Sequence, residues 1–468
     1  MSNSAKSALL ALVVYAALSS GCATTPLPPL PEGDVPDAWQ QMDVTSDVWP
    51  GLDWWSAFES EELQHIMVLL EERNLNLANN ARNLQLAQLN LRDAGFDLLP
   101  TPVVDFQAAS AYSGSKPGSG GDYSDSGSES YSFGAGLVYA DILSKPADWA
   151  AARARYDSVV ALAADVRLNT LGTAASTYFR VLLLRDLIEA AELNVKNAEE
   201  IARIVAARVE AGTVNKIDLL QQQIAVQREK SNLESLRQDE LSARASLALL
   251  LADSVNDIEV QAASLSDVKV PEVAPGLPSS LLTRRPDIAQ AESNLRVSRA
   301  NVDLARLAFL PDISISGSAS LFSSSLSDLL SNGDLSVNAT ASVAQLIFDN
   351  GARSRNVERS RLLLESALAD YRQTVISAFN EIEVALGNLE LLEALGAVAE
   401  TDLRRAEEAF RIAEVRYREG VADYQTVLVS QVSLFSTRDN FLNNKLARLN
   451  AVIAFYQSLG GGWEVLQD

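Results

Sequence analysis

Two residue types that carry much of protein covalent and metal chemistry occur only once each in this chain. Cys22 is the single cysteine and His65 the single histidine among 468 residues. One thiol cannot form an internal disulfide or a cysteine-based zinc cluster, and one imidazole leaves almost no material for Ser–His catalysis or histidine metal ligation. His65 lies in EELQHIMVLLEE, a helical pattern in which an exposed histidine without a role is expected. The sequence therefore predicts no enzyme, no metal site and no cofactor.

The position of Cys22 indicates a different chemistry, the attachment of lipid. Lys6 and an apolar run over residues 8–18 precede it, and this run is shorter than the roughly 20 apolar residues that span a bilayer. The residues SSGC resemble a bacterial lipobox, in which a signal peptidase cuts before the cysteine and the cysteine carries diacylglycerol and an N-acyl chain. Ser19 replaces the usual leucine. We predict a signal peptide over residues 1–21 and lipidation of Cys22; the alternative is an ordinary secretory signal with an incidental cysteine.

The residues after the cysteine indicate where the chain goes. Ala23 stands where bacterial lipoproteins retained in the inner membrane tend to have aspartate, so we expect the outer membrane. Residues 22–56 are rich in proline and show neither a helical nor a strand period, which predicts an extended, lipid-anchored tether. We expect the tether to dock on the rest of the protein through its tryptophans, Trp39, Trp49, Trp54 and Trp55.

Composition restricts the partners of the protein. There are 38 Lys and Arg against 61 Asp and Glu, a formal net charge of −23, and 47% of the residues are hydrophobic. Phosphate binding requires clustered positive charge, so a nucleic-acid partner is excluded. The hydrophobic content is sufficient for a substantial core.

The body of the chain alternates between long helical patterns and short strands. Residues 58–98 have a helical pattern, and two stretches with one apolar face, 103–112 and 131–139, predict strands joined by a Gly/Ser/Asp loop. Helical composition then continues over residues 147–251 and is broken once, at Gly212. The part before this glycine predicts a helix of about 65 residues, roughly 100 Å long. Helices of this length are typical of coiled coils and of proteins that bridge compartments.

The same order of predicted elements occurs twice along the chain. Pro311 matches Pro100 at an offset of 211 residues, and Gly420 matches Gly212 at an offset of 208. An internal duplication accounts for both offsets. The predicted organisation is repeat 1 over 57–260 (hairpin about 103–139, tip about 212), a linker over 261–284, repeat 2 over 285–460 (hairpin about 312–347, tip about 420) and a tail over 461–468.

The predicted strands have the length and alternation of transmembrane β-strands. Four strands in one chain cannot close a barrel, and an open sheet edge is not stable in lipid, so the barrel must be shared between chains. Two chains would give eight strands with a filled interior, and three would give twelve with a lumen. A soluble hairpin packed on a helical domain is the alternative. The heptad-spaced apolar stripe over residues 364–389 predicts lateral packing of the long helices.

Residues 276–317, GLPSSLLTRRPDIAQAESNLRVSRANVDLARLAFLPDISISG, closely resemble the signature of the outer-membrane efflux protein (TolC-like) family, in its lipoprotein branch. The first helical pattern and SVAQLIFDNGARSRNVERS resemble the same family. The resemblance implies a homotrimer, with a twelve-stranded barrel in the outer membrane of a Gram-negative bacterium and an α-helical tunnel across the periplasm. It also implies a periplasmic adaptor protein and an inner-membrane pump of the resistance-nodulation-division type, which together export drugs, toxic organics or metal ions.

The resemblance places a gate and an adaptor contact at the two helical tips, with candidate residues Arg208, Gly212, Asp218, Arg416, Gly420 and Asp423. The sixth position after the glycine is Asp218 in repeat 1 but Thr426 in repeat 2, so a charged ring at the gate would be weaker or placed differently. The alternative is that both glycines only end helices in the left-handed conformation. In RRPDI, Pro286 and Asp287 suit a helix start, and we assign no transport role to Arg284 or Arg285.

Two other functions stay open at this point. The same architecture serves as the outlet of type I protein secretion, and a lipid-anchored coiled-coil scaffold without a pore would show similar helical patterns.

Overall fold

The computed structural model describes all residues except 1–48, 116–123, 257–259, 263, 272–277 and 464–468. The predictions for Cys22 and Trp39 therefore lie outside the described residues.

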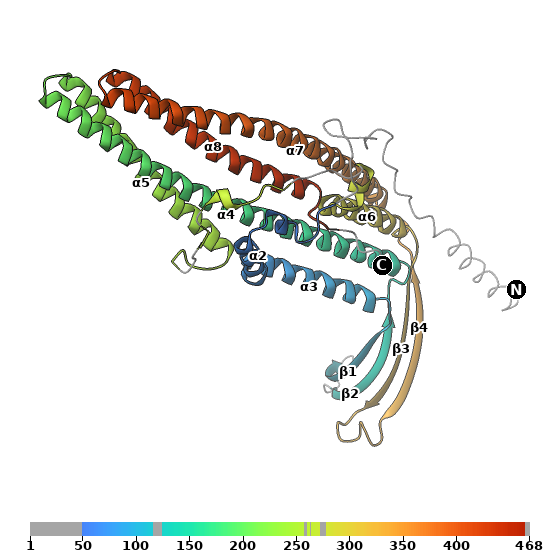
Figure 1. Ribbon diagram of the computed structural model, residues 1–468. Helices are drawn as coiled ribbons and strands as arrows, with labels where there is room; N and C mark the ends of the chain where they lie inside the picture. The colour runs from blue at the N-terminus through green and yellow to red at the C-terminus, as the bar shows by residue number, and fades with distance from the viewer. Residues whose placement is uncertain (1–48, 116–123, 257–259, 263, 272–277, 464–468) are drawn as a thin grey trace. The chain divides into compact units, whose positions relative to one another are not determined.

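The duplication predicted from the sequence is confirmed element by element (Figure 1). The first copy consists of α3 (Leu75–Phe96), β1 (Thr101–Ser115), β2 (Ser124–Tyr139), α4 (Lys145–Glu210) and α5 (Lys216–Leu250). The second consists of α6 (Pro286–Leu307), β3 (Asp312–Ser323), β4 (Asp334–Ala344), α7 (Ala352–Arg418) and α8 (Tyr424–Ser458). The helices α4 and α7 have 66 and 67 residues, and α5 and α8 have 35 each. Short elements occur outside the copies: η1 (Trp54–Phe58), α2 (Glu61–Arg73), η2 (Leu265–Asp267) and η3 (Pro278–Thr283).

The chain divides into two compact units, and the strands belong to the first, which contains Leu84–Val159 and Ala291–Tyr371. The strands form one antiparallel sheet in the order β1-β2-β3-β4. Pairing of β2 with β3 joins the two copies, with Tyr139 opposite Ile315. Within the described residues, no helix combines the length and the apolar character needed to cross a membrane.

The first hairpin is longer than the sequence predicts. The strands β1 and β2 continue to Ser115 and from Ser124, into the Gly/Ser/Asp segment that was predicted to be loop. Backbone pairing, Ser110 with Glu129 and Tyr112 with Gly127 among others, extends the ladder past the apolar residues. The hydrogen bonds between strands join backbone groups and do not require apolar side chains, so the alternation of apolar and polar residues alone underestimates the length of the strands.

The helical pattern over residues 58–98 forms two helices rather than one, because the chain breaks at Asn74. This residue has an extended conformation (φ −61°, ψ 123°) between α2 and α3 and is buried. Its side-chain oxygen accepts from the backbone N–H of Leu77 at 3.0 Å, and its amide donates to the carbonyl of Leu250 at 2.7 Å. Asn74 thereby starts α3 and attaches it to the end of α5.

The second unit, with Leu30–Asn83, Val160–Gln290 and Arg372–Asp468, holds the main core. Trp54, Trp55 and Phe58 are buried there with residues of α2, α4, α5 and α8. Trp49 lies 4.9 Å from the guanidinium carbon of Arg284, measured to the ring centroid. Trp49, Trp54 and Trp55 thus contact the rest of the chain as predicted, whereas the tether itself stays a prediction.

The apolar stripe on α7 faces inward as predicted: Val375, Ala378 and Ile382 are fully buried. A second cluster near the ends of the long helices joins the two helical pairs, with Ile201 and Val205 of α4 against Tyr417 of α7 and Tyr424 of α8. Within each pair, α4 with α5 and α7 with α8, the two helices run antiparallel (Figure 1).

Candidate functional site

The two turns predicted as tips end their helices in the same way. Gly212 has a φ of 71°, and the backbone N–H of Thr213 donates to the carbonyl of Arg208 at 2.9 Å. Gly420 has a φ of 79°, and the N–H of Val421 donates to the carbonyl of Arg416 at 2.8 Å. This pattern is the Schellman motif, in which glycine adopts the left-handed conformation without steric cost. The interpretation of both glycines as helix caps is therefore confirmed.

Each turn also starts the next helix with a polar side chain. Asn215 accepts from the N–H of Ile217 at 3.1 Å and begins α5. Asp423 accepts from the hydroxyl of Thr426 at 2.6 Å and from its N–H at 2.9 Å, and begins α8. These two hydrogen bonds hold the pKa of Asp423 below its usual range. The carboxylate predicted at the gate is thus already engaged in a helix N-cap.

Arg208 connects the first turn to the second. Its Nη2 donates to the carbonyl of Tyr417 and, at 3.4 Å, to that of Arg418, at the end of α7. The guanidinium also lies 4.3 Å from the centroid of the Tyr417 ring. A cation at a helix C-terminus is favourable both for the unpaired carbonyls and for the helix dipole. The first arginine therefore holds the two helical pairs together at their ends.

Arg416, its counterpart in the second copy, has different surroundings. It is exposed, and within the described part of the chain its guanidinium makes no hydrogen bond or ion pair. Of the six predicted tip residues, the structure thus brings Arg208 into contact with the other turn but leaves Arg416 at the surface.

Two tyrosines fill the space beneath the turns. Tyr424 donates its hydroxyl to Oε1 of the fully buried Gln222 at 2.7 Å. Burial, together with the negative charge of the nearby Asp218, raises the pKa of Tyr424 to about 12. Tyr417 is 1% exposed, and its hydroxyl has no hydrogen-bond partner. Asp218 therefore lies beside this aromatic pair, whereas its counterpart Thr426 donates to the cap of α8.

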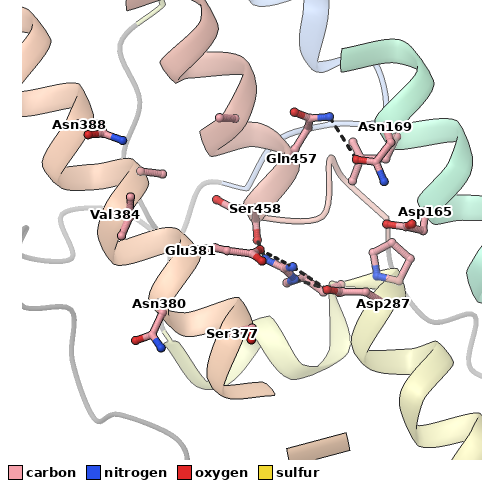
Figure 2. Close-up of a pocket in the computed structure, with 15 residues that line it drawn as sticks. Asp165, Asn169, Asp287, Ser377, Asn380, Glu381, Val384, Asn388, Gln457 and Ser458 are labelled. Carbon is pink, nitrogen blue, oxygen red and sulfur yellow. Dashed lines mark hydrogen bonds and ion pairs between the residues drawn. The ribbon is translucent and has the colours of Figure 1, made fainter. Parts of the chain in front are cut away.

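A second polar site lies at the start of α6, around a cavity of about 770 Å³ (Figure 2). Arg285, with 8% of its side chain exposed, donates from Nε and Nη2 to the two carboxylate oxygens of Asp287 at 2.9 and 2.6 Å. It also donates to Glu381 of α7 at 2.7 Å and to the carbonyl of Ser458 of α8 at 2.9 Å. One guanidinium thus connects three helices.

Negative charge exceeds positive charge around this cavity. Asp165 of α4 lines it, and burial together with the carboxylate of Asp287 raises the pKa of Asp165, while Arg285 acts in the opposite direction. Gln457 donates to Asn169 at 3.3 Å on the same wall (Figure 2).

The start of α6 at this site agrees with the sequence prediction, and the cross-link does not have a signal in the sequence. The helix α6 begins at Pro286, and Asp287 accepts from the N–H of Ile288, so the predicted helix start is confirmed. The cross-link through Arg285 was missed, because its partner Glu381 is 96 residues away and nothing local in the sequence points to it. Within the described residues, no group of three His, Cys, Asp or Glu side chains could hold a metal ion.

Comparison with known proteins gives one consistent result. The sequence model of the family described as outer membrane efflux protein matches residues 66–253 and 277–461. The chain is 32% identical over 474 residues to the pyoverdine export outer membrane protein OpmQ of Pseudomonas aeruginosa, covering 97% of each chain. It is 30% identical over 306 residues to the solvent efflux pump outer membrane protein SrpC of Pseudomonas putida, covering 65% of each.

The fold has a close counterpart among solved structures. The crystal structure of the Campylobacter jejuni CmeC outer membrane channel matches with a TM-score of 0.86 over 96% of each chain, at 22% identity. At this identity the match establishes the fold, including the two repeated halves.

Proposed function

Because this chain belongs to the outer membrane efflux protein family, we propose that it forms the outer-membrane outlet of a tripartite pump that exports small molecules. The observation that carries the proposal is the similarity to OpmQ over 97% of both chains, together with the fold shared with CmeC. The outlet is a passive channel and not an enzyme.

A homotrimer is the assembly that we propose for this outlet. The strands β1 and β4 are the edges of the sheet, and each pairs with only one neighbour. Such edges are not stable in lipid unless another chain pairs with them. Three chains would supply twelve strands, enough for a barrel with a lumen, and the long helices would continue it as a tunnel.

Three finer features belong to the same proposal. Cys22 carries the lipid anchor and the chain resides in the outer membrane. The two turns, Arg208–Asp218 and Arg416–Thr426, form the gate and contact a periplasmic adaptor, which is coupled to an inner-membrane pump of the resistance-nodulation-division type. The shared Schellman geometry of the turns and the link through Arg208 support a gate that opens by separation of the two helical pairs.

The cargo is a small molecule. Relatives named for the export of pyoverdine and of solvents favour small organic compounds over secreted proteins. Drugs and metal ions are likewise small cargo.

Deletion of the gene and resistance profiling test this function. We expect the deletion strain to accumulate toxic small molecules and to become sensitive to them, and the intact gene to restore resistance. Unchanged resistance to every compound, together with the loss of one secreted protein, would contradict the proposal and favour a secretion outlet.

A further inference from the structure

A smaller cavity, of about 330 Å³, lies between α5 and α8 in the second unit. Ala198 of α4 lines it together with apolar side chains from both walls, among them Ile224 of α5 and Leu428 of α8. Five polar residues complete the lining: Gln221, Gln425, Arg228, Glu229 and Gln431. Neither the gate proposal nor the Arg285 site uses this cavity.

Gln431 is the unusual member of this lining. It is 2% exposed, and among the residues that the structure describes neither its Oε1 nor its Nε2 has a hydrogen-bond partner. The other buried glutamine of the region, Gln222, satisfies both ends, with its amide on the carbonyl of Ala198 at 2.7 Å and its oxygen on Tyr424. Leaving a buried polar group unpaired destabilises the folded protein. The side-chain amide of Gln431 is therefore available to form hydrogen bonds with a group that enters the cavity.

The charge of the cavity determines which group that is. Glu229 makes no ion pair within the described part of the chain, and burial and the carboxylate of Asp439 on α8 raise its pKa. Arg228 acts in the opposite direction but is exposed and has the smaller effect. A half-buried carboxylate that forms no ion pair in the described part of the chain, in the same cavity as an amide without a partner, is suited to a positively charged donor of hydrogen bonds.

We propose that this cavity binds a small organic cation with planar N–H donors, an amidine or a guanidine. The cation donates to the carboxylate of Glu229 and to Oε1 of Gln431, and its apolar part packs against Ile224 and Leu428. The Nε2 of Gln431 then takes a retained water or an acceptor elsewhere on the ligand. Small-ligand sites combine apolar walls with a few placed polar groups in this way. The proposal does not rest on efflux activity, since binding is measured on the isolated protein.

Isothermal titration of the purified full-length protein in detergent tests the proposal, with benzamidine as the probe and benzamide as its neutral analogue. We expect benzamidine to bind and benzamide to bind at least tenfold more weakly. Glu229→Gln should weaken benzamidine binding about tenfold or more, because a charge-assisted hydrogen bond becomes a neutral one. Gln431→Leu should weaken it severalfold without loss of folding, since an unpaired buried amide is replaced by an apolar group.

Gln223→Leu is the matched control. Gln223 is the equivalent of Gln431 in the first copy, is exposed, and does not line this cavity, so its substitution should leave binding unchanged. The proposal is overturned if benzamidine does not bind at millimolar concentration or binds no better than benzamide. Equal affinity of the wild type and both cavity variants would also overturn it. Thermal melting of each variant establishes that it is folded.

Discussion

The arginines of the two tips have equivalent positions in the duplication but different surroundings. Arg208 caps the carbonyls at the end of α7 and lies on the ring of Tyr417, whereas Arg416 is exposed. The sequence alone predicts equal roles for them, because the residue type and the offset are the same. The difference arises because the two helical pairs meet at Tyr417, and this contact between distant segments has no local signal.

The contrast between these arginines gives a matched pair of variants. Arg208→Ala removes a charge-assisted capping contact and a cation–π contact, so we expect the local opening free energy of the second turn to fall by about 1–2 kcal/mol. Arg416→Ala should change it by less than about 0.5 kcal/mol, as is usual for exposed sites. Hydrogen exchange of the amides of residues 419–422 measures both. Equal effects of the two variants would contradict the assigned link.

The N-cap role of Asp423 predicts a dependence on pH. Its folded-state pKa lies below the ordinary value, so its contribution to stability is present above about pH 4 and is lost as the pH falls through the folded-state pKa. Asp423→Asn keeps a cap acceptor and does not titrate, so its first turn of α8 should keep its hydrogen-exchange protection on acidification. If the wild type and Asp423→Asn lose protection in parallel, the cap carboxylate is not responsible.

Arg285 is predicted to stabilise the fold through its ion pairs with Asp287 and Glu381. Arg285→Gln leaves Asp287 and Glu381 without their cation, and we expect a loss of unfolding free energy of about 3 kcal/mol, the lower end for a broken buried pair. Both acids keep some contact with water, which limits the loss. Arg285→Lys keeps the charge but lacks the planar guanidinium, so its free energy of unfolding should lie between those of the wild type and Arg285→Gln. Denaturant unfolding measures the stabilities of the wild type and the two variants. If Arg285→Gln is as stable as the wild type, the cross-link is contradicted.

At the scale of elements, the helices and the duplication were predictable because long periodic patterns and single glycines mark them. The lengths of α4 and α7 and the positions of both turns agree with the sequence. The break at Asn74 was not predictable from periodicity, since the residues around it are good helix formers and its partner is the carbonyl of Leu250. The longer strands of the first hairpin were missed because backbone pairing continues where side-chain alternation stops.

The glycine after α8 provides a test at this scale. Gly460 has a φ of 85°, and a Cβ placed on it would lie 1.9 Å from the carbonyl oxygen of Arg284. We expect Gly460→Ala to cost about 2–5 kcal/mol, from left-handed backbone strain of about 1–2 kcal/mol and overpacking of about 1–3 kcal/mol. Gly212→Ala is the control: its φ is 71°, but no atom of the described residues lies within 4 Å of the added Cβ, so only the backbone cost of about 1–2 kcal/mol applies. Thermal unfolding compares them, and similar melting temperatures would contradict the close approach.

At the scale of the whole molecule, the proposed function is that of an outlet shared between several copies of the chain. The sequence predicts the family and the repeated halves, because long motifs carry that information. Its composition indicates that catalytic residue types are scarce. The polar sites could not, since Gln431 and Arg285 acquire their surroundings only when helices distant in the sequence pack together. The gate remains a prediction at the two turns.

Single-channel recording tests the central claim most directly. The full-length protein, purified as an oligomer and inserted into planar bilayers, should give discrete and reproducible conductance steps, because the account describes a water-filled passive outlet. Arg208→Ala should increase the open probability by weakening the link between the helical pairs, and Arg416→Ala should not. A stable oligomer that inserts but conducts no ions at any voltage, in the wild type and in Arg208→Ala alike, would contradict the account and favour a scaffold without a pore.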